Sequence, residues 1–341
     1  MYISASTIDD LLRKLFPRLL SDKLLKGESR ITATKGSTVE MRGVMLQLTN
    51  PRMRLSRTEE KGTLFSCLGE WLWYLAGSND VEHIKYYIKK YHEFAENDGT
   101  VHGAYGPRIF GPRPGDQVEQ IIDLLKRKST SRQAVIQIFD CDDLQKKYKD
   151  VPCTCTMQFL LRGHRLHMVT HMRSNDAFKG LPHDIFAFTL IQELIARSLD
   201  VELGNYKHSV GSLHLYDEDR NRAERYLQEG WQSRIAMPSM PKGDPRPSIR
   251  KLLDIEVDIR QGKATGKEAD SLDPYWADLV RILQIYKYSQ SRDTLRKISL
   301  LSRAMDSDVY RVYIDQRRST QTKKLLVHDT PEQLSLLPQT D

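Results

Sequence analysis

The chain has 341 residues, of which 39% are hydrophobic and 28% are charged, and its formal net charge is +7. This composition is typical of a soluble globular protein with a substantial core, and no apolar run reaches the ~20 residues that a membrane span requires. The charge is a mild bias that suits an anionic small molecule at least as well as a polynucleotide, and of the two we expect the small molecule.

The N-terminus and the cysteines indicate a cytoplasmic protein. Acidic and basic residues interrupt the apolar stretch of MYISASTIDDLLRKLFPRLLSD, which therefore predicts an amphipathic helix over residues 1–25 rather than a secretory signal. The four cysteines show no regular spacing. In a chain without an export signal, we expect them to be free thiols in a reducing compartment.

After this first helix, the chain predicts a hairpin, three helices and a loop. Residues 31–48 are rich in Thr, Val and Met around a glycine turn, which is typical of a hairpin. Apolar periodicity and capping signals predict helices over 63–76, 81–97 and 117–128. Residues 102–116 hold four glycines and three prolines and are predicted to form a loop.

The middle of the chain predicts strands and two further helices. Strands are predicted over 134–140, 157–162, 165–173 and 213–216. The second and third of these strands form a hairpin about Gly163-His164. Mostly apolar residues after Pro182 predict a long helix over 183–199, and a shorter one is predicted over 217–229.

The composition changes near residue 262. Residues 236–247 carry four prolines and are predicted to be a connector, whereas 255–262 (IEVDIRQG) alternate like a strand. A polar linker then leads to charged helices over 273–320. We therefore predict an α+β domain over residues 1–262, followed by a linker and a small helical extension over 263–341.

The segment VPCTCTMQF (151–159) places Cys153 and Cys155 at the start of a predicted strand. From this fragment alone, a metal site, a disulfide, buried thiols and a nucleophile all remain open. A zinc site lacks a second Cys or His pair, and a disulfide between i and i+2 is strained. Buried thiols are ordinary for cysteines that enter a strand, whereas a nucleophile requires positive charge nearby.

Residues downstream bear on this choice. The predicted hairpin brings Arg173 close to Cys153, where a guanidinium can lower the pKa of a thiol or hold an anionic substrate. An Arg173–Asp176 pair is equally an ordinary surface ion pair. Asp184 lies in the first turn of the next helix, where an acid ordinarily complements the helix dipole.

Taken together, the motifs resemble the thymidylate synthase family. PCTCTMQF resembles its nucleophile segment, MRSNDAFKGLPHDIFAFTLI its arginine–serine segment and LHLYDED its nucleotide segment. GEWLWYLAG resembles the helix with the family's catalytic glutamate, AYG its tyrosine–glycine turn, and Ser-Arg at 29–30 and 131–132 its phosphate-binding arginines. The resemblance covers residues 25–262 and implies a mixed sheet with flanking helices in an obligate homodimer.

The resemblance implies a role for each matching residue. Cys153 would add to carbon 6 of a pyrimidine ring, so that carbon 5 attacks the methylene of 5,10-methylenetetrahydrofolate. Glu70 would organise water and protons, and Tyr105 would lie beside the thiol. Cys155 has no role in the family and is expected in the core, and no metal is expected. The residues that would hold the nucleotide are Arg30, Arg173, Ser174, His214, Tyr216 and the partner subunit's Arg132. The residues that would face the pterin are Asp176 and Gly180.

Departures from the methylating members of the family shape the predicted reaction. Asp184 replaces an asparagine, as in the family's cytidylate hydroxymethylases. A carboxyl suits cytosine because it can accept from the amino group and share a proton with the ring nitrogen. Tyr91 and Phe94 replace tryptophans, and a smaller hydroxylated ring at Tyr91, beside the folate, can admit water to the methylene. Gln133 replaces a second phosphate-binding arginine and weakens that clamp by one charge.

The sequence therefore predicts hydroxymethylation of carbon 5 of a cytidine monophosphate, CMP or dCMP, with methylenetetrahydrofolate and water. One alternative is methylation of deoxyuridylate, as in thymidylate synthase itself. The other is a non-catalytic protein that binds nucleotides or nucleic acid.

Overall fold

The computed structural model describes residues 1–341 except 22–23, 25–28, 34–35, 112–114, 292–293 and 329–341. The chain divides into two units, Met1–Leu253 and Asp254–Asp341, and the boundary falls within helix α9 (Arg246–Gln261). Among the described residues, no helix combines the length and the apolar character that crossing a bilayer requires.

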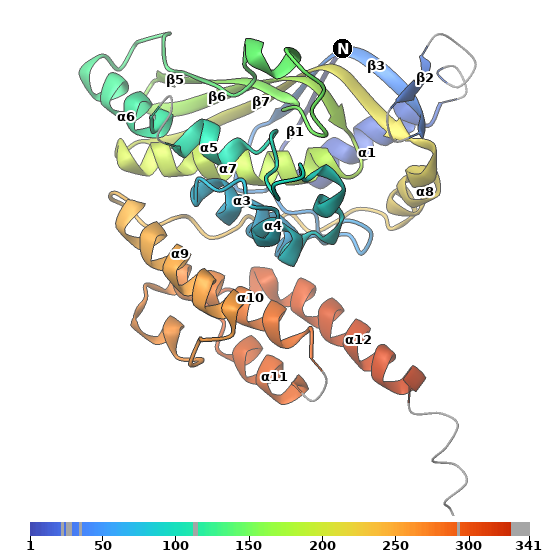
Figure 1. Cartoon of the computed structure of the whole chain (residues 1–341), viewed down its shortest axis with the longest axis vertical. Helices are drawn as coiled ribbons and strands as arrows, with labels where there is room; N and C mark the ends of the chain where they lie inside the picture. Colours follow the sequence, from blue (N-terminus) through green and yellow to red (C-terminus); the bar gives the residue numbers. More distant parts are fainter. Residues whose placement is uncertain (22–23, 25–28, 34–35, 112–114, 292–293, 329–341) are drawn as a thin grey trace, which may run out of the picture. The chain divides into compact units, whose positions relative to one another are not determined.

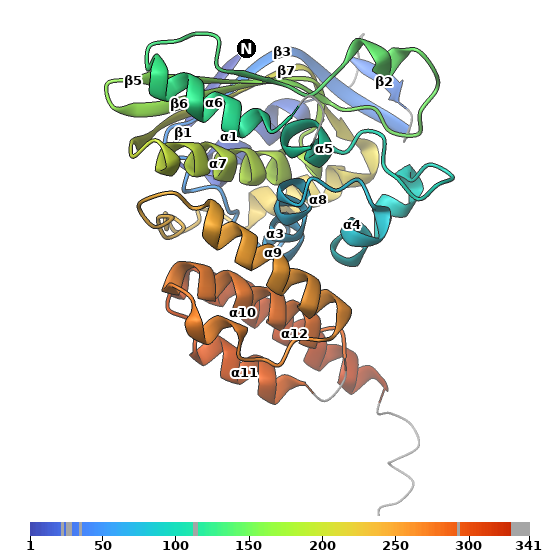
Figure 2. The same ribbon diagram turned by 60° about the vertical axis from the view of Figure 1, so that its left-hand side comes forward.

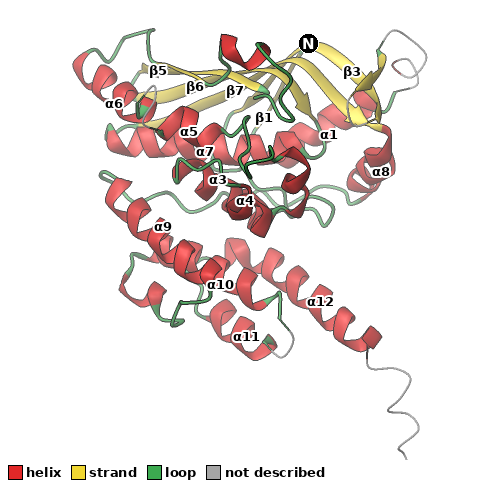
Figure 3. Cartoon of the chain, in the orientation of Figure 1, coloured by secondary structure: helices red, strands yellow, loops and turns green. Residues whose placement is uncertain are grey.

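Seven strands form one mixed sheet in the first unit (Figures 1 and 3). The strands are β1 (Tyr2–Ala5), β2 (Arg30–Ala33), β3 (Gly36–Leu48), β4 (Val135–Gln137), β5 (Thr154–Arg162), β6 (Arg165–Asp176) and β7 (Glu202–Tyr216). The order across the sheet is β1-β3-β7-β6-β5-β4, and β2 pairs with the first half of β3. The pairs β1–β3 and β6–β7 are parallel, whereas the other pairs are antiparallel.

Helices α1 and α7 cover one face of this sheet, and α3 packs on α7 (Figures 1 and 2). Helix α7 is apolar on nearly every side because it lies between the sheet and α3. The α-helices of this unit are α1 (Ile8–Leu19), α3 (Leu64–Leu75), α4 (Val81–Tyr87), α5 (Tyr105–Phe110), α6 (Gln117–Arg127), α7 (Gly180–Ser198) and α8 (Arg220–Gln228). Short 3-10 helices are η1 (Lys89–Phe94), η2 (Cys141–Leu144) and η3 (Asp217–Asp219). The predicted α+β class, with a mixed sheet and flanking helices, is confirmed.

The second unit is helical, as predicted for the C-terminal extension. Its helices are η4 (Glu268–Ser271), α10 (Pro274–Tyr288), α11 (Leu295–Arg303), η5 (Asp308–Tyr310) and α12 (Arg311–His328). Asp273 caps α10 by accepting from the backbone N–H of Tyr275 at 3.0 Å. Buried Asp278 accepts from the backbone N–H groups of Asp306 and Ser307 at 2.9 Å, which fixes the turn before η5.

Five segments differ from their predicted structure, mostly because tertiary pairing and helical periodicity outweigh local composition. The helix predicted over 81–97 is divided into α4, which ends at Tyr87, and the 3-10 helix η1. Residues 2–5 form a strand because they pair with the end of β3. Residues 105–110 form α5 within the predicted loop, and the strand predicted at 213–216 is the end of the much longer β7. Residues 255–261 lie in α9, where buried positions recur every three or four residues.

Candidate active site

Cys153 lies half-buried at the start of β5, beside the end of β6. The backbone N–H of Arg173 donates to the Cys153 carbonyl at 2.9 Å. The Arg173 guanidinium donates through Nε to the Pro152 carbonyl and through Nη2 to the Val151 carbonyl, each at 2.9 Å. The hairpin thus brings Arg173 to the nucleophile segment, and its activating effect on the thiol stays a prediction.

All four cysteines are free thiols, so the disulfide interpretation is excluded in this structure. Cys67 is buried, Cys141 is exposed, and Cys153 and Cys155 are half-buried. The expectation that Cys155 belongs to the core is therefore wrong. Its carbonyl accepts from the backbone N–H of Ile138 at 2.9 Å, beyond the end of β4.

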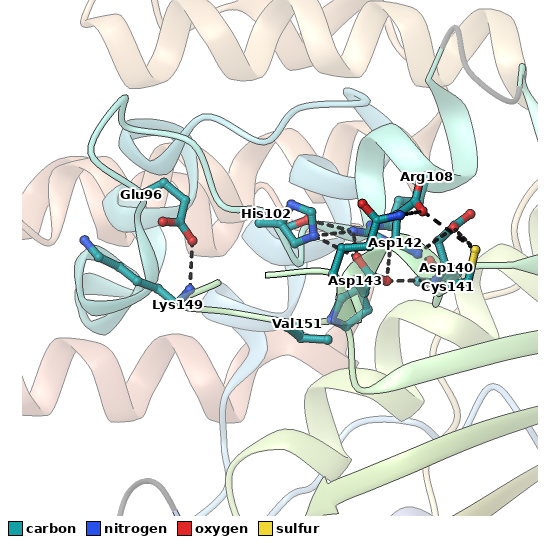
Figure 4. A network of polar contacts seen from close by, with 12 residues as sticks. Glu96, His102, Arg108, Asp140, Cys141, Asp142, Asp143, Lys149 and Val151 are labelled. Carbon is teal, nitrogen blue, oxygen red and sulfur yellow. Dashed lines mark hydrogen bonds and ion pairs between the residues drawn. The ribbon is translucent and has the colours of Figure 1, made fainter. Parts of the chain in front are cut away.

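The loop that leads to Cys153 is anchored by the buried carboxylate of Asp143 (Figure 4). Asp143 accepts from Arg108 Nη1 and Nη2 at 2.8 and 2.6 Å, and its Oδ1 forms a hydrogen bond with His102 Nε2 at 2.7 Å. It also accepts from the backbone N–H of Asp140 at 2.8 Å. His102 lies just before α5 and Arg108 lies within it. This cluster therefore ties the loop to the helix that begins with Tyr105.

We expect Asp143→Ala to destabilise the fold by ~3 kcal/mol, because it leaves the Arg108 guanidinium without its bidentate partner. Burial raises the pKa of Asp143, but the hydrogen bonds from Arg108 and His102 outweigh it and hold the pKa below its ordinary value. The stabilisation is therefore present above a pH of about 4 and is lost as the pH falls through the lowered pKa. Urea unfolding at several pH values measures both effects. Asp142→Ala, on the exposed side of the same turn, is the control and should change stability by less than ~0.5 kcal/mol.

Glu70 is buried on α3 and accepts a short hydrogen bond, 2.5 Å, from the hydroxyl of Tyr91. Burial raises the pKa of Glu70 to about 6, and the hydrogen bonds from Tyr91 and Tyr74 limit this rise. The Tyr91 ring also packs edge-on against Trp73, with 5.3 Å between ring centroids. Tyr91 was predicted to face the folate, and its hydrogen bond to Glu70 was not predicted.

We expect Tyr91→Phe to move the acidic limb of the kcat/KM–pH profile up by about one pH unit. The substitution removes a donor that favours the charged carboxylate, so the pKa of Glu70 rises further. Activity should fall most below pH 7 and recover at higher pH. Tyr2→Phe, which removes an exposed hydroxyl bonded to Gln47, is the matched control. An unmoved limb in Tyr91→Phe would show that Glu70 is not the titrating group.

Tyr105 and Asp184 lie on the α5 and α7 side of Cys153. The backbone N–H of Thr154 donates to the Tyr105 hydroxyl at 3.3 Å, which places that hydroxyl next to the residue that follows Cys153. Asp184 is buried and accepts from Asn175 Nδ2 at 2.7 Å. Burial, followed by the negative charge of Glu70, holds the pKa of Asp184 well above its ordinary value. Both effects favour the protonated form of the Asp184 carboxyl relative to an exposed aspartate.

The predicted nucleotide-binding residues gather at the ends of β6 and β7. The parallel pairing of these strands sets Ser174 Oγ 3.5 Å from His214 Nδ1, and the His214 and Tyr216 rings meet edge-on with 5.1 Å between centroids. Arg30 reaches this end from β2 and donates to Asp217 Oδ2 at 2.6 Å. The structure thus brings together four of the residues that the sequence grouped.

Asp176 and Gly180 shape the turn between β6 and α7. Asp176 Oδ1 accepts from the backbone N–H groups of Phe178 and Lys179 at 2.8 and 3.0 Å, so one of its oxygens is already engaged. A Cβ at Gly180 would lie only 3.0 Å from Asn175 Nδ2. Glycine therefore allows the close approach of the turn to the Asn175 amide.

Arg132 is exposed and precedes β4. Its carbonyl accepts from Gln158 Nε2 at 2.9 Å, partway along β5 and away from Cys153. The structure therefore does not bring Arg132 to the other candidate residues of the same chain. Its role in the site of a partner subunit stays a prediction.

Comparison with known proteins finds similarity over the region that contains these residues. A family model for thymidylate synthase matches residues 14–258. A deoxyuridylate hydroxymethyltransferase of Pseudomonas phage M6 is 34% identical over 167 residues, which are 48% of this chain and 48% of that protein. A deoxyuridylate hydroxymethyltransferase of Bacillus phage SP01 is 30% identical over 221 residues, 60% of this chain and 57% of that protein.

The matched regions thus span about half of the length of these curated relatives. Both relatives carry the name of a one-carbon transferase that leaves a hydroxymethyl group. The family model itself covers most of the chain, including every element that carries a candidate residue. The chain therefore belongs to the thymidylate synthase family, which confirms the family predicted from its motifs.

Proposed function

We propose that this chain hydroxymethylates carbon 5 of a cytidine monophosphate, CMP or dCMP. The observation that carries the choice of base is Asp184, a buried carboxyl whose pKa is raised by its burial and by the charge of Glu70. A neutral carboxyl offers an O–H to the bare ring nitrogen of cytosine and a carbonyl oxygen to its amino group. The same contact draws electrons from the ring and makes carbon 6 more electrophilic.

The chemistry then follows from Cys153. Its thiolate bonds to carbon 6, and the electron pair of the ring double bond moves to carbon 5. Carbon 5 forms a bond to the one-carbon unit and loses its proton. Glu70, with its pKa of about 6, can take up or return a proton near neutral pH. The folate nitrogen would leave with the electron pair of its bond to the one-carbon unit, which gives tetrahydrofolate and an exocyclic methylene on carbon 5. Water would then add to that methylene and lose a proton, while the ring double bond re-forms and expels the Cys153 thiolate from carbon 6, which leaves a hydroxymethyl group.

The residues present fit a folate co-substrate, 5,10-methylenetetrahydrofolate, which would supply the one-carbon unit. Trp73, Tyr91 and Phe94 form an edge-to-face cluster beside Glu70. The buried indole N–H of Trp73 has no hydrogen-bond partner among the described residues, and an acceptor on a ligand would satisfy it. A smaller, hydroxylated ring at Tyr91, bonded to Glu70 at 2.5 Å, would admit water to the one-carbon unit, which favours a hydroxymethyl rather than a methyl product.

Phosphate binding and the dimer belong to the same proposal. Arg173 keeps Nη1 without a hydrogen bond among the described residues, and Arg30 would exchange its exposed ion pair with Asp217 for a phosphate. A homodimer would bring the partner subunit's Arg132 to this end of the site.

A second candidate is hydroxymethylation of deoxyuridylate, which the names of the two phage relatives favour. A neutral carboxyl can also serve uracil, because it can accept from the ring N–H and donate to the carbonyl. Base selectivity then depends on which oxygen of Asp184 carries the proton.

Release of tritium from carbon 5 tests the proposal. CMP, dCMP and deoxyuridylate labelled at carbon 5 are each incubated with the protein and methylenetetrahydrofolate. We expect the fastest release from a cytidylate, without the rise in absorbance that dihydrofolate would give. Fastest release from deoxyuridylate favours the second candidate, dihydrofolate formation indicates methylation, and no release from any nucleotide overturns the enzyme.

A further inference from the structure

A chain of buried polar side chains runs from the sheet to Asp184. Tyr206 OH lies 2.6 Å from His208 Nδ1, His208 Nε2 lies 3.0 Å from Asn175 Oδ1, and Asn175 Nδ2 lies 2.7 Å from Asp184 Oδ2. Tyr206 and His208 come from β7 and Asn175 from its parallel neighbour β6. Tyr206, His208 and Asn175 are 1%, 0% and 4% exposed, so water cannot substitute for any of these hydrogen bonds.

The hydrogen bonds of this chain run in one direction. Asn175 presents its amide nitrogen to Asp184, so its carbonyl oxygen faces His208 and requires an N–H there. Burial lowers the pKa of His208 to about 3, and the ring is therefore neutral with a single N–H, at Nε2. Its bare Nδ1 accepts from the Tyr206 hydroxyl. Each group thus donates toward Asp184.

Packing holds this arrangement. The His208 ring stacks on Phe188 of α7, with 6.5 Å between centroids and 23° between planes. Gly180 lies against the other end of the chain, where a Cβ would stand 3.0 Å from Asn175 Nδ2 and 3.5 Å from Asp184 Oδ2. The amide of Asn175 therefore has little room to move, and its orientation is set by its two polar neighbours.

We propose that Asn175 and His208 are positioning residues that set base selectivity by fixing which oxygen of Asp184 accepts and which carries the proton. In a protonated carboxyl, a hydrogen bond from an N–H group favours the form in which the accepting oxygen is the carbonyl oxygen. The bond from Asn175 therefore holds Oδ2 as the acceptor, and the proton resides on Oδ1. A carboxyl with fixed donor and acceptor oxygens distinguishes cytosine from uracil, whose donors and acceptors are reversed. This inference rests on the proposed function, since it assigns Asp184 to the base.

His208→Phe tests the proposal, because it keeps a ring against Phe188 and removes both nitrogens. Freed from His208, the Asn175 amide can turn over and accept from Asp184. We expect the ratio of kcat/KM for the preferred cytidylate to that for deoxyuridylate to fall by about tenfold or more. His208→Gln, which retains an N–H toward Asn175, should keep most of the ratio. Tyr206→Phe preserves volume and should lower the ratio less than His208→Phe does.

The matched control is Gln192→Met on α7. Gln192 is fully buried and donates to the Leu166 carbonyl at 2.8 Å, so its loss weakens the fold without touching Asp184. We expect it to lower the midpoint of thermal unfolding and to leave the ratio unchanged. A purely structural role for His208 would produce the same pattern as Gln192→Met.

Nucleotide binding by calorimetry, without the folate donor, separates this inference from the proposed function. The infrared carbonyl band of Asp184, identified by its loss in Asp184→Asn, should shift in His208→Phe and Tyr206→Phe. A wild-type protein that does not distinguish the bases overturns both proposals. In the other case, the wild-type protein discriminates between the bases while folded His208→Phe and Tyr206→Phe variants keep its ratio and its infrared band. That result overturns only the role proposed for Asn175 and His208.

Discussion

Cys153→Ala should lower turnover by at least about a thousandfold while leaving nucleotide binding nearly unchanged. In the proposed reaction the thiol bonds to carbon 6, and without that bond neither carbon 5 nor the one-carbon unit would be activated. Binding should persist because the predicted phosphate and sugar contacts come from other residues, at the ends of β6 and β7. Tritium release and calorimetric titration with the same nucleotide measure the two properties separately.

A nucleotide with fluorine at carbon 5 tests the same prediction through the mass of a covalent adduct. When carbon 5 carries fluorine, no proton can leave it, so the covalent adduct on Cys153 should accumulate in the presence of the folate donor. Mass spectrometry should find the added mass on the peptide that contains Cys153, and it should be absent in Cys153→Ala. Cys155→Ala is the control, two residues along the same segment, and should form the adduct. Adduct formation that survives in Cys153→Ala would assign the chemistry to another residue.

The hairpin that follows Cys153 was predictable because its key contacts are local in the chain. A glycine turn at Gly163-His164, with both residues at positive φ, fixes the register of β5 against β6. That register alone carries Arg173 back to the Cys153 carbonyl. The long apolar helix after Pro182 is likewise apparent from its composition. Helix α7 begins slightly earlier than predicted, at Gly180, and contains Pro182 in its first turn, where proline is tolerated.

Contacts between distant elements were not predictable in the same way. Tyr91 lies 21 residues from Glu70, in a 3-10 helix, and nothing in either segment signals their hydrogen bond. His208 lies outside the strands predicted from the sequence. The parallel pairing of β6 with β7 sets it opposite Thr170, and its side chain reaches Asn175 at 3.0 Å. Neither histidine nor asparagine marks a core position by itself. The contact between the two buried side chains therefore becomes apparent only in the folded structure.

The polar chain and the pair formed by Glu70 and Tyr91 share a physical logic. In each, a buried acid accepts a hydrogen bond from a neutral group, the Tyr91 hydroxyl or the Asn175 amide, rather than from a cation. A cation would hold the carboxylate charged, whereas a neutral donor leaves the raised pKa that burial produces. Glu70, with its pKa of about 6, is thereby suited to exchange a proton near neutral pH, whereas the raised pKa of Asp184 favours its protonated form. The negative charge of Glu70 contributes to the rise at Asp184, so the two acids are suited to different roles.

Asp184→Asn should reverse the preference for the base, with a change of about a hundredfold in the ratio of kcat/KM between the preferred cytidylate and deoxyuridylate. The amide has a fixed donor and a fixed acceptor, and it matches the ring N–H and carbonyl of uracil but opposes those of cytosine. Cytidylate would then leave a buried donor and acceptor unpaired, which is costly in a site from which water is excluded. The ratio is measured with both nucleotides competing in one tritium-release assay.

A matched substitution distinguishes this effect from the loss of any buried acid. Asp9→Asn alters another buried carboxyl of the same unit, which accepts from Ser56 Oγ and Tyr226 OH at 2.6 and 2.7 Å. It should lower stability and leave the ratio of the two nucleotides as in the wild type. If Asp184→Asn behaves like Asp9→Asn, the carboxyl of Asp184 does not read the base. The cytidylate assignment then fails, while the covalent role of Cys153 remains open to its own test, because that thiol attacks either pyrimidine at the same carbon.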